Sequence, residues 1–325
     1  MVFIIAEAGV NHNGSASQAK ELVDAAKDCG CDAIKFQAWK AENLASNDAQ
    51  LTDYQKSQVE ASDQYEMLSK LSLERDDHIL LKQYCFDKDI EYLCSPFDID
   101  GIEMLSKFKM SKVKVPSGEI TNLPYLRDLA KYKWEIILST GMSDMSEIES
   151  AINILNCRDR IALLHCTSEY PAPYNEVNLN CIKTMHDRFQ MPIGYSDHTT
   201  GIEVAIAAVA IGASIIEKHI TLDRGMNGPD HIASTEPKIF KQMVESIRNI
   251  QLAMGNGIKL SQESEDKNKI NIRKSIYATT DILEGQLIRE KMITCKRPAT
   301  GISPMDWNTI VGSQAKRTYK AGEQI

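Results

Sequence analysis

Two histidines, His198 and His219, stand out in this sequence as candidate metal ligands. Each follows a short apolar run, at residues 192–195 and 213–217, that is typical of a buried strand. Two imidazoles at the ends of neighbouring strands can share one divalent cation and leave its other positions open for a substrate. We therefore expect a metal centre here. The alternative is a pair of core or surface histidines with no ion.

Lysines and serines near the ends of other predicted strands suggest a site for an anionic substrate. Lys114 lies inside an apolar strand pattern, where a buried ammonium is costly unless an anion pairs with it. Lys35 lies near the end of another such strand. Together with nearby serine hydroxyls these lysines would suit a phosphate and a carboxylate, and plain salt bridges are the alternative. The serines are Ser95, Ser117 and Ser139.

Three carboxylates, Glu7, Glu119 and Asp230, are available as acids or bases. Glu7 follows a fully apolar strand, where a carboxylate needs a cation, a proton or a metal-bound water as partner. For each of the three, a solvated loop position is the alternative. We interpret His165 as a wall or core residue, although it could be a third metal ligand, and His12 as a turn residue that could reach the pocket mouth.

These residues belong to a regular alternation of strand and helix patterns. Eight alternating units predict a parallel sheet, because each parallel crossover needs a helix. Eight units that close on themselves form a (β/α)8 TIM barrel, in which the active site lies at the carboxyl ends of the strands. The predicted strands cover residues 2–6, 32–37, 90–94, 113–115, 135–138, 161–164, 192–195 and 213–217.

The pattern changes beyond the barrel. We expect the barrel at residues 1–257, a polar linker at 258–270 and a small, mainly β domain at 271–325. This last domain is too small to bury much surface alone, so we expect it to pack on another surface. Residues 40–65 are polar and irregular and are interpreted as a lid or binding loop. The β pieces expected in the small domain cover residues 275–278, 282–285, 293–296 and 309–311.

The composition argues against several classes of protein, among them nucleic-acid-binding, secreted and membrane proteins. The chain has 325 residues, of which 43% are hydrophobic and 25% charged, and its net charge of −8 argues against general binding to nucleic acid or anionic membranes. Its eight cysteines do not form paired motifs, which favours reduced cytosolic thiols. The apolar start at residues 2–5 is too short for a secretory signal, and no apolar run is long enough to span a bilayer.

Several motifs occur in order along the whole chain and carry a resemblance to a known family. They are AEAGVNHNG (6–14), KFQ (35–37), SPF (95–97), KVPSGE (114–119), STGM (139–142), YSDH (195–198), EKH (217–219) and GPDH (228–231). This set resembles the sialic acid (nonulosonate) synthases. The stretches KSI (274–276) and KRP (296–298) resemble the antifreeze-like SAF domain at the carboxyl terminus of that family.

The resemblance implies an activity and a set of residue roles. Members of the family condense phosphoenolpyruvate with the open-chain aldehyde of an N-acylated mannosamine-type sugar and release phosphate. Their metal, typically Mn²⁺, would bind His198 and His219, with Glu7 beside its bound water and Glu119 available to protonate the new alkoxide. The phosphoenolpyruvate contacts would be Lys35, Ser95, Lys114, Ser117, Ser139, Ser196 and His198. The sugar contacts would be Glu119, Ser168, Tyr170, Asp230 and Arg297.

The resemblance also implies a domain-swapped homodimer, in which the SAF domain of one subunit caps the barrel of the other and Arg297 reaches the N-acyl group. Ser168 stands where some members have asparagine, and Arg273 where some have an aromatic residue. Residues 8–11 and 119–124 look closer to the N-acetylneuraminate and N,N′-diacetyllegionaminate branches than to pseudaminate synthases. We expect the legionaminate type, with an N-acetylneuraminate synthase acting on N-acetylmannosamine as the alternative.

Two different readings compete with this synthase. One is a Schiff-base aldolase on the same barrel, with Lys114 or Lys218 as the nucleophile. The other is a non-catalytic carbohydrate-binding protein in which the small domain is the active part.

Overall fold

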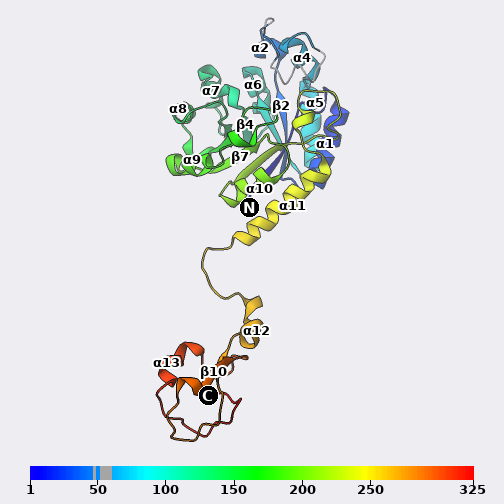
Figure 1. Cartoon of the computed structure of the whole chain (residues 1–325). Coiled ribbons are helices and arrows are strands. Elements are labelled where there is room, and N and C mark those ends of the chain that lie inside the picture. Colours follow the sequence, from blue (N-terminus) through cyan, green and yellow to red (C-terminus); the bar gives the residue numbers. More distant parts are fainter. Residues whose placement is uncertain (47–48, 52–60) are drawn as a thin grey trace. The chain divides into compact units, whose positions relative to one another are not determined.

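The computed structural model describes residues 1–46, 49–51 and 61–325. The chain divides into two compact units, Met1–Gly255 and Asn256–Ile325 (Figure 1). The expected lid at residues 40–65 lies partly outside the described residues. Its described part contains one short helix, α2 (Ala41–Leu44).

The first unit contains eight parallel strands in the order β3-β2-β1-β8-β7-β6-β5-β4. The two strands at the ends of this order, β3 and β4, also lie next to each other, so the sheet forms a nearly closed barrel (Figure 1). This architecture confirms the predicted (β/α)8 fold. The strands are β1 (Phe3–Gly9), β2 (Ala33–Ala38), β3 (Glu91–Pro96), β4 (Lys112–Val115), β5 (Glu135–Ser139), β6 (Ile161–Cys166), β7 (Ile193–Asp197) and β8 (Ile215–His219).

Helices connect the strands and cover the outside of the barrel (Figure 1). Their starts are set by local sequence: Ser15 accepts a hydrogen bond from the Gln18 amide, and Asp144 with Glu147 forms a capping box. Besides α2, they are α1 (Ala16–Asp28), α4 (Gln64–Leu71), α5 (Arg75–Asp87), α6 (Ile99–Lys107), α7 (Leu123–Leu129), α8 (Met145–Leu155), α9 (Cys181–Phe189), α10 (Glu203–Ala210) and α11 (Pro237–Met254).

The barrel interior is layered, because every second side chain of a strand points inward. Near the amino ends of the strands the inward side chains form an apolar cluster: Ile5, Ala33, Leu93, Ile137, Leu164 and Ile215. Two positions further along the same strands the residues are Glu7, Lys35, Ser95, Ser139, Cys166 and Glu217. The apolar layer thus closes the bottom of the barrel, and the polar layer faces its carboxyl end.

The second unit has a small core of its own, which includes Ile276, Ile282, Ile288 and Tyr319. Two of the expected β pieces form an antiparallel pair, whereas residues 309–311 overlap the helical turn α13 and Ile282 makes only a single bridge to Tyr319. The segment expected as a linker contains most of a helix, α12. The elements are α12 (Glu263–Ile272), β9 (Ser275–Ala278), β10 (Ile293–Lys296) and α13 (Trp307–Ile310).

In the described parts of the chain, no helix combines the length and the apolar character that a membrane crossing requires.

Candidate functional site

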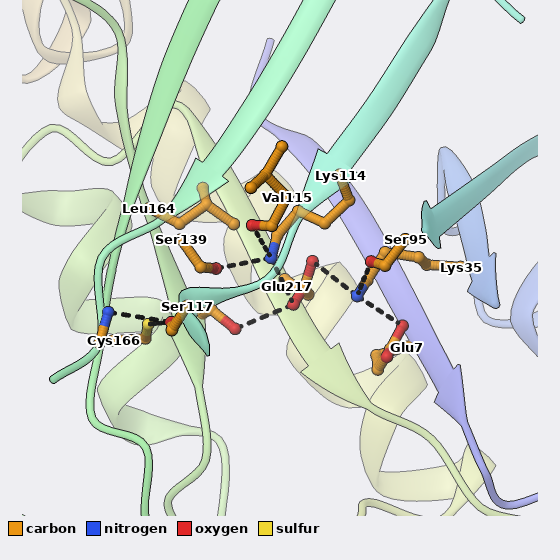
Figure 2. Close-up of polar contacts among 12 residues, drawn as sticks. Glu7, Lys35, Ser95, Lys114, Val115, Ser117, Ser139, Leu164, Cys166 and Glu217 are labelled. Carbon is orange, nitrogen blue, oxygen red and sulfur yellow. Dashed lines mark hydrogen bonds and ion pairs between the residues drawn. The ribbon is translucent and has the colours of Figure 1, made fainter. Parts of the chain in front are cut away.

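A network of buried charged side chains lies inside the barrel (Figure 2). Lys35 Nζ lies 3.0 Å from Glu7 Oε2 and 3.6 Å from Glu217 Oε2. Lys114 Nζ lies 3.8 Å from the other oxygen of Glu217. At most 5% of any of these side chains is exposed. Two lysines and two glutamates from four different strands therefore balance one another inside the barrel.

Hydroxyl groups surround this network. Lys114 Nζ donates to Ser139 Oγ at 2.6 Å, and Lys35 Nζ donates to Ser95 Oγ at 3.1 Å. Ser196 Oγ donates to Glu217 Oε1 at 3.0 Å. The lysines and three of the serines expected to bind an anion therefore share one part of the barrel interior.

The network shifts the pKa values of its members in opposite directions. Burial lowers the pKa of Lys114, although Glu217 opposes this effect. Burial also acts against the charged form of Lys35, but Glu217 and Glu7 outweigh it and raise the pKa of Lys35. Burial raises the pKa of Glu7, and Lys35 only partly offsets it. Burial disfavours the charged form of Glu217 too, but Lys114 and Lys35 together lower its pKa to about 2.

Gly141, two residues after the end of β5, allows several polar groups to converge. Its amide donates to Ser117 Oγ at 3.0 Å, and that hydroxyl lies 3.3 Å from Cys166 Sγ. A Cβ atom added to Gly141 would lie 2.2 Å from Ser168 Oγ, which is closer than any real contact. A larger residue would therefore displace these hydroxyls, and Ser168, expected on the sugar side, lies in the same group as Ser117.

The two predicted metal ligands lie side by side, with ring centroids 5.7 Å apart. His198 Nδ1 lies 2.6 Å from the carbonyl oxygen of Thr167, which assigns the proton to that nitrogen and leaves Nε2 as a lone pair. His219 Nδ1 is buried, has no hydrogen-bond partner among the described residues, and lies 3.6 Å from Asp230 Oδ2. Burial lowers the pKa of both imidazoles, and for His219 the neighbouring His198 adds to this effect. Two neutral imidazoles are the form that a metal ion requires.

Two further residues shape the surroundings of the histidines. The Tyr170 ring lies 4.2 Å from the His198 ring and 5.6 Å from the His219 ring, measured between centroids. Gly9 has a φ of +52°, and an added Cβ would lie 3.1 Å from both His219 Cε1 and Asp230 Oδ2. A glycine at the end of β1 therefore lets His219 and Asp230 pack against the backbone.

The other predicted acids and Arg297 are placed as follows. Burial raises the pKa of Asp230 to about 7, with a further contribution from Glu7. Glu119 accepts a hydrogen bond of 2.6 Å from Asn122, and burial raises its pKa. Arg297 lies in the second unit, where it is exposed and its Nε donates to the carbonyl oxygen of Ile272.

Two residues considered for chemistry do not face the charged network. His165 lies between the inward-facing Leu164 and Cys166 on β6, so alternation places it on the outer side of the barrel wall, where its Nε2 lies 2.6 Å from the carbonyl oxygen of Val177. Lys218, one candidate aldolase nucleophile, pairs with Asp197 at 2.7 Å, and alternation along β8 directs it away from the barrel interior.

Sequence reasoning overlooked two members of the site. In the sequence Glu217 stands out only as part of the EKH motif, yet its carboxylate lies close to both lysines. Gln37, which donates to Glu7 Oε1 at 2.6 Å, was also missed. The alternation of Ile215, Glu217 and His219 along one strand is the signal that could have revealed Glu217.

The residues present fit a metal ion held by two protein ligands. Within residues 1–46, 49–51 and 61–325, no three or more His, Cys, Asp or Glu residues cluster as a complete metal site. His198 and His219, whose rings lie side by side, could hold such an ion, and water and substrate would then complete the coordination.

Comparisons with known proteins agree with this geometry. Residues 22–259 match the NeuB family and residues 273–325 match the SAF domain. The chain is similar to the N,N′-diacetyllegionaminic acid synthases of Campylobacter jejuni, at 48% identity over 99% of this chain and 98% of that protein, and of Legionella pneumophila, at 44% over 99% and 93%. It is also similar to the crystal structure of an N-acetylneuraminic acid (sialic acid) synthetase from Leptospira borgpetersenii in complex with citrate. That similarity has a TM-score of 0.73 and 36% identity, covering 82% of this chain and 90% of the other.

These matches cover the barrel and the small domain, and they confirm the family that the motifs predicted. The chain belongs to the NeuB family of sialic acid synthases and carries a SAF domain at its carboxyl-terminal end.

Proposed function

We propose that this enzyme joins phosphoenolpyruvate to the open-chain aldehyde of 2,4-diacetamido-2,4,6-trideoxymannose and forms N,N′-diacetyllegionaminic acid and phosphate. The observation that carries the proposal is the pair of buried lysines, Lys35 and Lys114, beside the two neutral imidazoles of His198 and His219 at the carboxyl end of the barrel. The two relatives named as legionaminic acid synthases support the choice of sugar.

Phosphoenolpyruvate would bind at the lysines. It carries a phosphate and a carboxylate, and two ammonium groups in a low-dielectric interior can hold both. The hydroxyls of the surrounding serines supply further hydrogen bonds without adding charge. The proposed contacts are Lys35, Ser95, Lys114, Ser117, Ser139 and Ser196.

In the reaction, the C2–C3 double bond of phosphoenolpyruvate supplies the electron pair for a new bond from C3 to the aldehyde carbon. The aldehyde oxygen becomes an alkoxide and takes a proton, and Glu119, whose pKa is raised by burial, suits this role. A water molecule attacks the positively charged C2 and gives one proton to Glu7. The bond between C2 and the phosphate oxygen then breaks, the C2 hydroxyl gives its remaining proton to the departing phosphate, and C2 becomes a ketone. Asp230 and Tyr170, which border the histidines, would hold the sugar.

His198 and His219 would hold a divalent cation, which we propose is Mn²⁺. When bound, such an ion supplies Lewis acidity to an oxygen of the substrate. The orphaned, buried Nδ1 of His219 and the fixed tautomer of His198 support this assignment.

The acceptor is tested by measuring phosphate release with two sugars and with none. We expect a kcat/KM for 2,4-diacetamido-2,4,6-trideoxymannose well above that for N-acetylmannosamine, and no release without a sugar. A preference for N-acetylmannosamine would make the enzyme an N-acetylneuraminate synthase. Covalent trapping of a lysine by borohydride in the presence of a carbonyl substrate would instead indicate Schiff-base chemistry.

The proposal extends to the assembly. We propose a domain-swapped homodimer in which residues 271–325 of one subunit cap the barrel, residues 1–257, of the other and bring Arg297 to the N-acyl group. The exposure of Arg297 supports this, because a second molecule can reach it. The eight cysteines are free, which supports a reducing, cytoplasmic location.

A further inference from the structure

Another buried ion pair, between Lys218 and Asp197, lies outside the charged network and takes no part in the proposed reaction. Lys218 Nζ lies 2.7 Å from Asp197 Oδ2, and the exposed fractions of the two side chains are 1% and 0%. The two residues are register partners on the adjacent strands β8 and β7. Each directly precedes one of the two candidate metal ligands, His219 and His198. Because side chains alternate along a strand, the ion pair and the imidazoles lie on opposite sides of the barrel wall.

The same pair holds the turn that carries His198. Lys218 Nζ donates to the carbonyl oxygen of Thr199 at 2.8 Å. Asp197 Oδ1 accepts hydrogen bonds from the Thr199 amide at 3.0 Å and hydroxyl at 2.8 Å, and from the Tyr195 hydroxyl at 3.3 Å. The residues before and after His198 are therefore both tied to one ammonium group on β8.

This arrangement couples the two imidazoles through the backbone. His219 follows Lys218 directly, so its backbone moves with β8, and His198 lies between two residues bound to Lys218. The imidazole ring of His198 is held by the hydrogen bond between its Nδ1 and the carbonyl oxygen of Thr167. The distance of 5.7 Å between the two rings thus depends on the ion pair behind them.

Stability alone does not account for a buried ion pair at this position. The desolvation of two buried charges offsets much of their attraction, and replacing such a pair by apolar residues of similar size is often neutral or stabilising. An apolar pair could not orient the turn after β7, because hydrogen bonds from Lys218 and Asp197 are what hold this turn to β8. We propose that Lys218 and Asp197 are positioning residues that set the relative placement of His198 and His219 for one shared cation. The inference rests on the proposed metal-dependent function.

The test uses the full-length protein and two variants, the double variant Lys218→Met with Asp197→Leu and the single variant Asp197→Asn. The affinity for Mn²⁺ is measured by calorimetry and by the loss of the free-ion electron paramagnetic resonance signal, without substrates. We expect the double variant to keep its thermal midpoint and to bind Mn²⁺ about tenfold to a hundredfold more weakly, the range typical for residues that orient metal ligands. The KM for phosphoenolpyruvate at saturating Mn²⁺ should change far less, because Lys35 and Lys114 remain in place.

Arg248→Met is the matched control. It breaks another ion pair of the barrel unit, Arg248 to Asp32 at 2.8 Å, near the amino ends of β1 and β2. Its Mn²⁺ affinity should equal that of the unmodified protein.

The other outcomes distinguish failure of the positioning role from failure of the proposed metal site. Unchanged Mn²⁺ affinity in the folded double variant overturns the inference, as does an equal loss in Arg248→Met. If the double variant does not fold, the same criteria apply to Asp197→Asn, which keeps the side-chain shape. If the unmodified protein does not bind Mn²⁺, the proposed metal site is wrong and the inference falls with it. Tight binding by the unmodified protein and the double variant alike contradicts only the positioning role.

Discussion

Glu217 and Lys114 meet across the full width of the barrel. They belong to β8 and β4, which are four strands apart in either direction around the barrel, yet Glu217 Oε1 lies 3.8 Å from Lys114 Nζ. The second oxygen of the same carboxylate faces Lys35 at 3.6 Å. Burial favours loss of the proton from Lys114, and the charge of Glu217 opposes that loss. Glu217 therefore helps to keep Lys114 positively charged.

Glu217→Gln should change how phosphoenolpyruvate binding depends on pH. The substitution removes the charge and keeps the shape, so the pKa of Lys114, already lowered by burial, falls further. The ammonium is present below that pKa and lost above it. The KM for phosphoenolpyruvate should therefore begin to rise at a lower pH than in the unmodified enzyme, as measured by initial rates from about pH 6 to about pH 9.

Glu91→Gln is the control for this change. Glu91 lies 3.2 Å from Lys112, which is on the same strand as Lys114, but both members of this ion pair are partly exposed. Its pH profile should match that of the unmodified enzyme. A Glu217→Gln profile that also matches would show that Glu217 does not govern the charge of Lys114.

His219→Ala should remove nearly all turnover and leave the fold intact. Loss of one of two imidazole ligands should lower kcat by about three orders of magnitude, because Lewis-acid stabilisation contributes several kcal/mol. Chelation should silence the unmodified enzyme, and Mn²⁺ should restore it. His165→Ala, which removes a wall histidine bonded to the carbonyl of Val177, should reduce stability and keep the dependence on metal. Retained activity of His219→Ala in metal-free buffer would refute the ligand assignment.

Arg297→Ala should raise the KM for the sugar about tenfold to a hundredfold, which corresponds to the free energy of one hydrogen bond to a charged group. The KM for phosphoenolpyruvate should stay nearly unchanged. The reason is that the proposed partner of Arg297 is the N-acyl group of the sugar. Arg317→Ala is the control, because Arg317 is an arginine of the same domain that pairs with Glu323 at 3.2 Å. Equal increases in both Michaelis constants would mean that the small domain does not cap the sugar site.

Gly141→Ala should weaken phosphoenolpyruvate binding. The new methyl group would lie 2.2 Å from Ser168 Oγ and 2.9 Å from Ser117 Oγ, so both hydroxyls would have to move. Overpacking of this kind costs about 1–3 kcal/mol, and we expect the KM for phosphoenolpyruvate to rise by about tenfold or more. Gly225→Ala, in an exposed turn, serves as the control. Unchanged kinetics in Gly141→Ala would show that these hydroxyls do not contact the substrate.

Local patterns in the sequence were enough to predict the barrel and many of the polar groups at its carboxyl end. Each of the eight predicted strands overlaps an observed one, because buried parallel strands are short apolar runs bounded by helices and turns. The strand-end positions of Lys35, Lys114, His198 and His219 follow from the same patterns. The small domain was harder to predict, since short, partly exposed segments carry a weaker pattern: residues 309–311 overlap a helical turn, and α12 was not expected.

Only the tertiary structure decided which of these side chains meet. Closure of the barrel brings Lys114 and Glu217 together from opposite strands, and no local pattern encodes that contact. Alternation along β8 then separates neighbours in the sequence: Glu217 and His219 face the interior, whereas Lys218 pairs with Asp197 behind the wall. The sequence by itself determined the elements and the chemical groups they carry, because both depend on residues close in the chain. The counter-ions and the spacing of the two imidazoles depend on contacts between distant residues, which exist only once the barrel has formed.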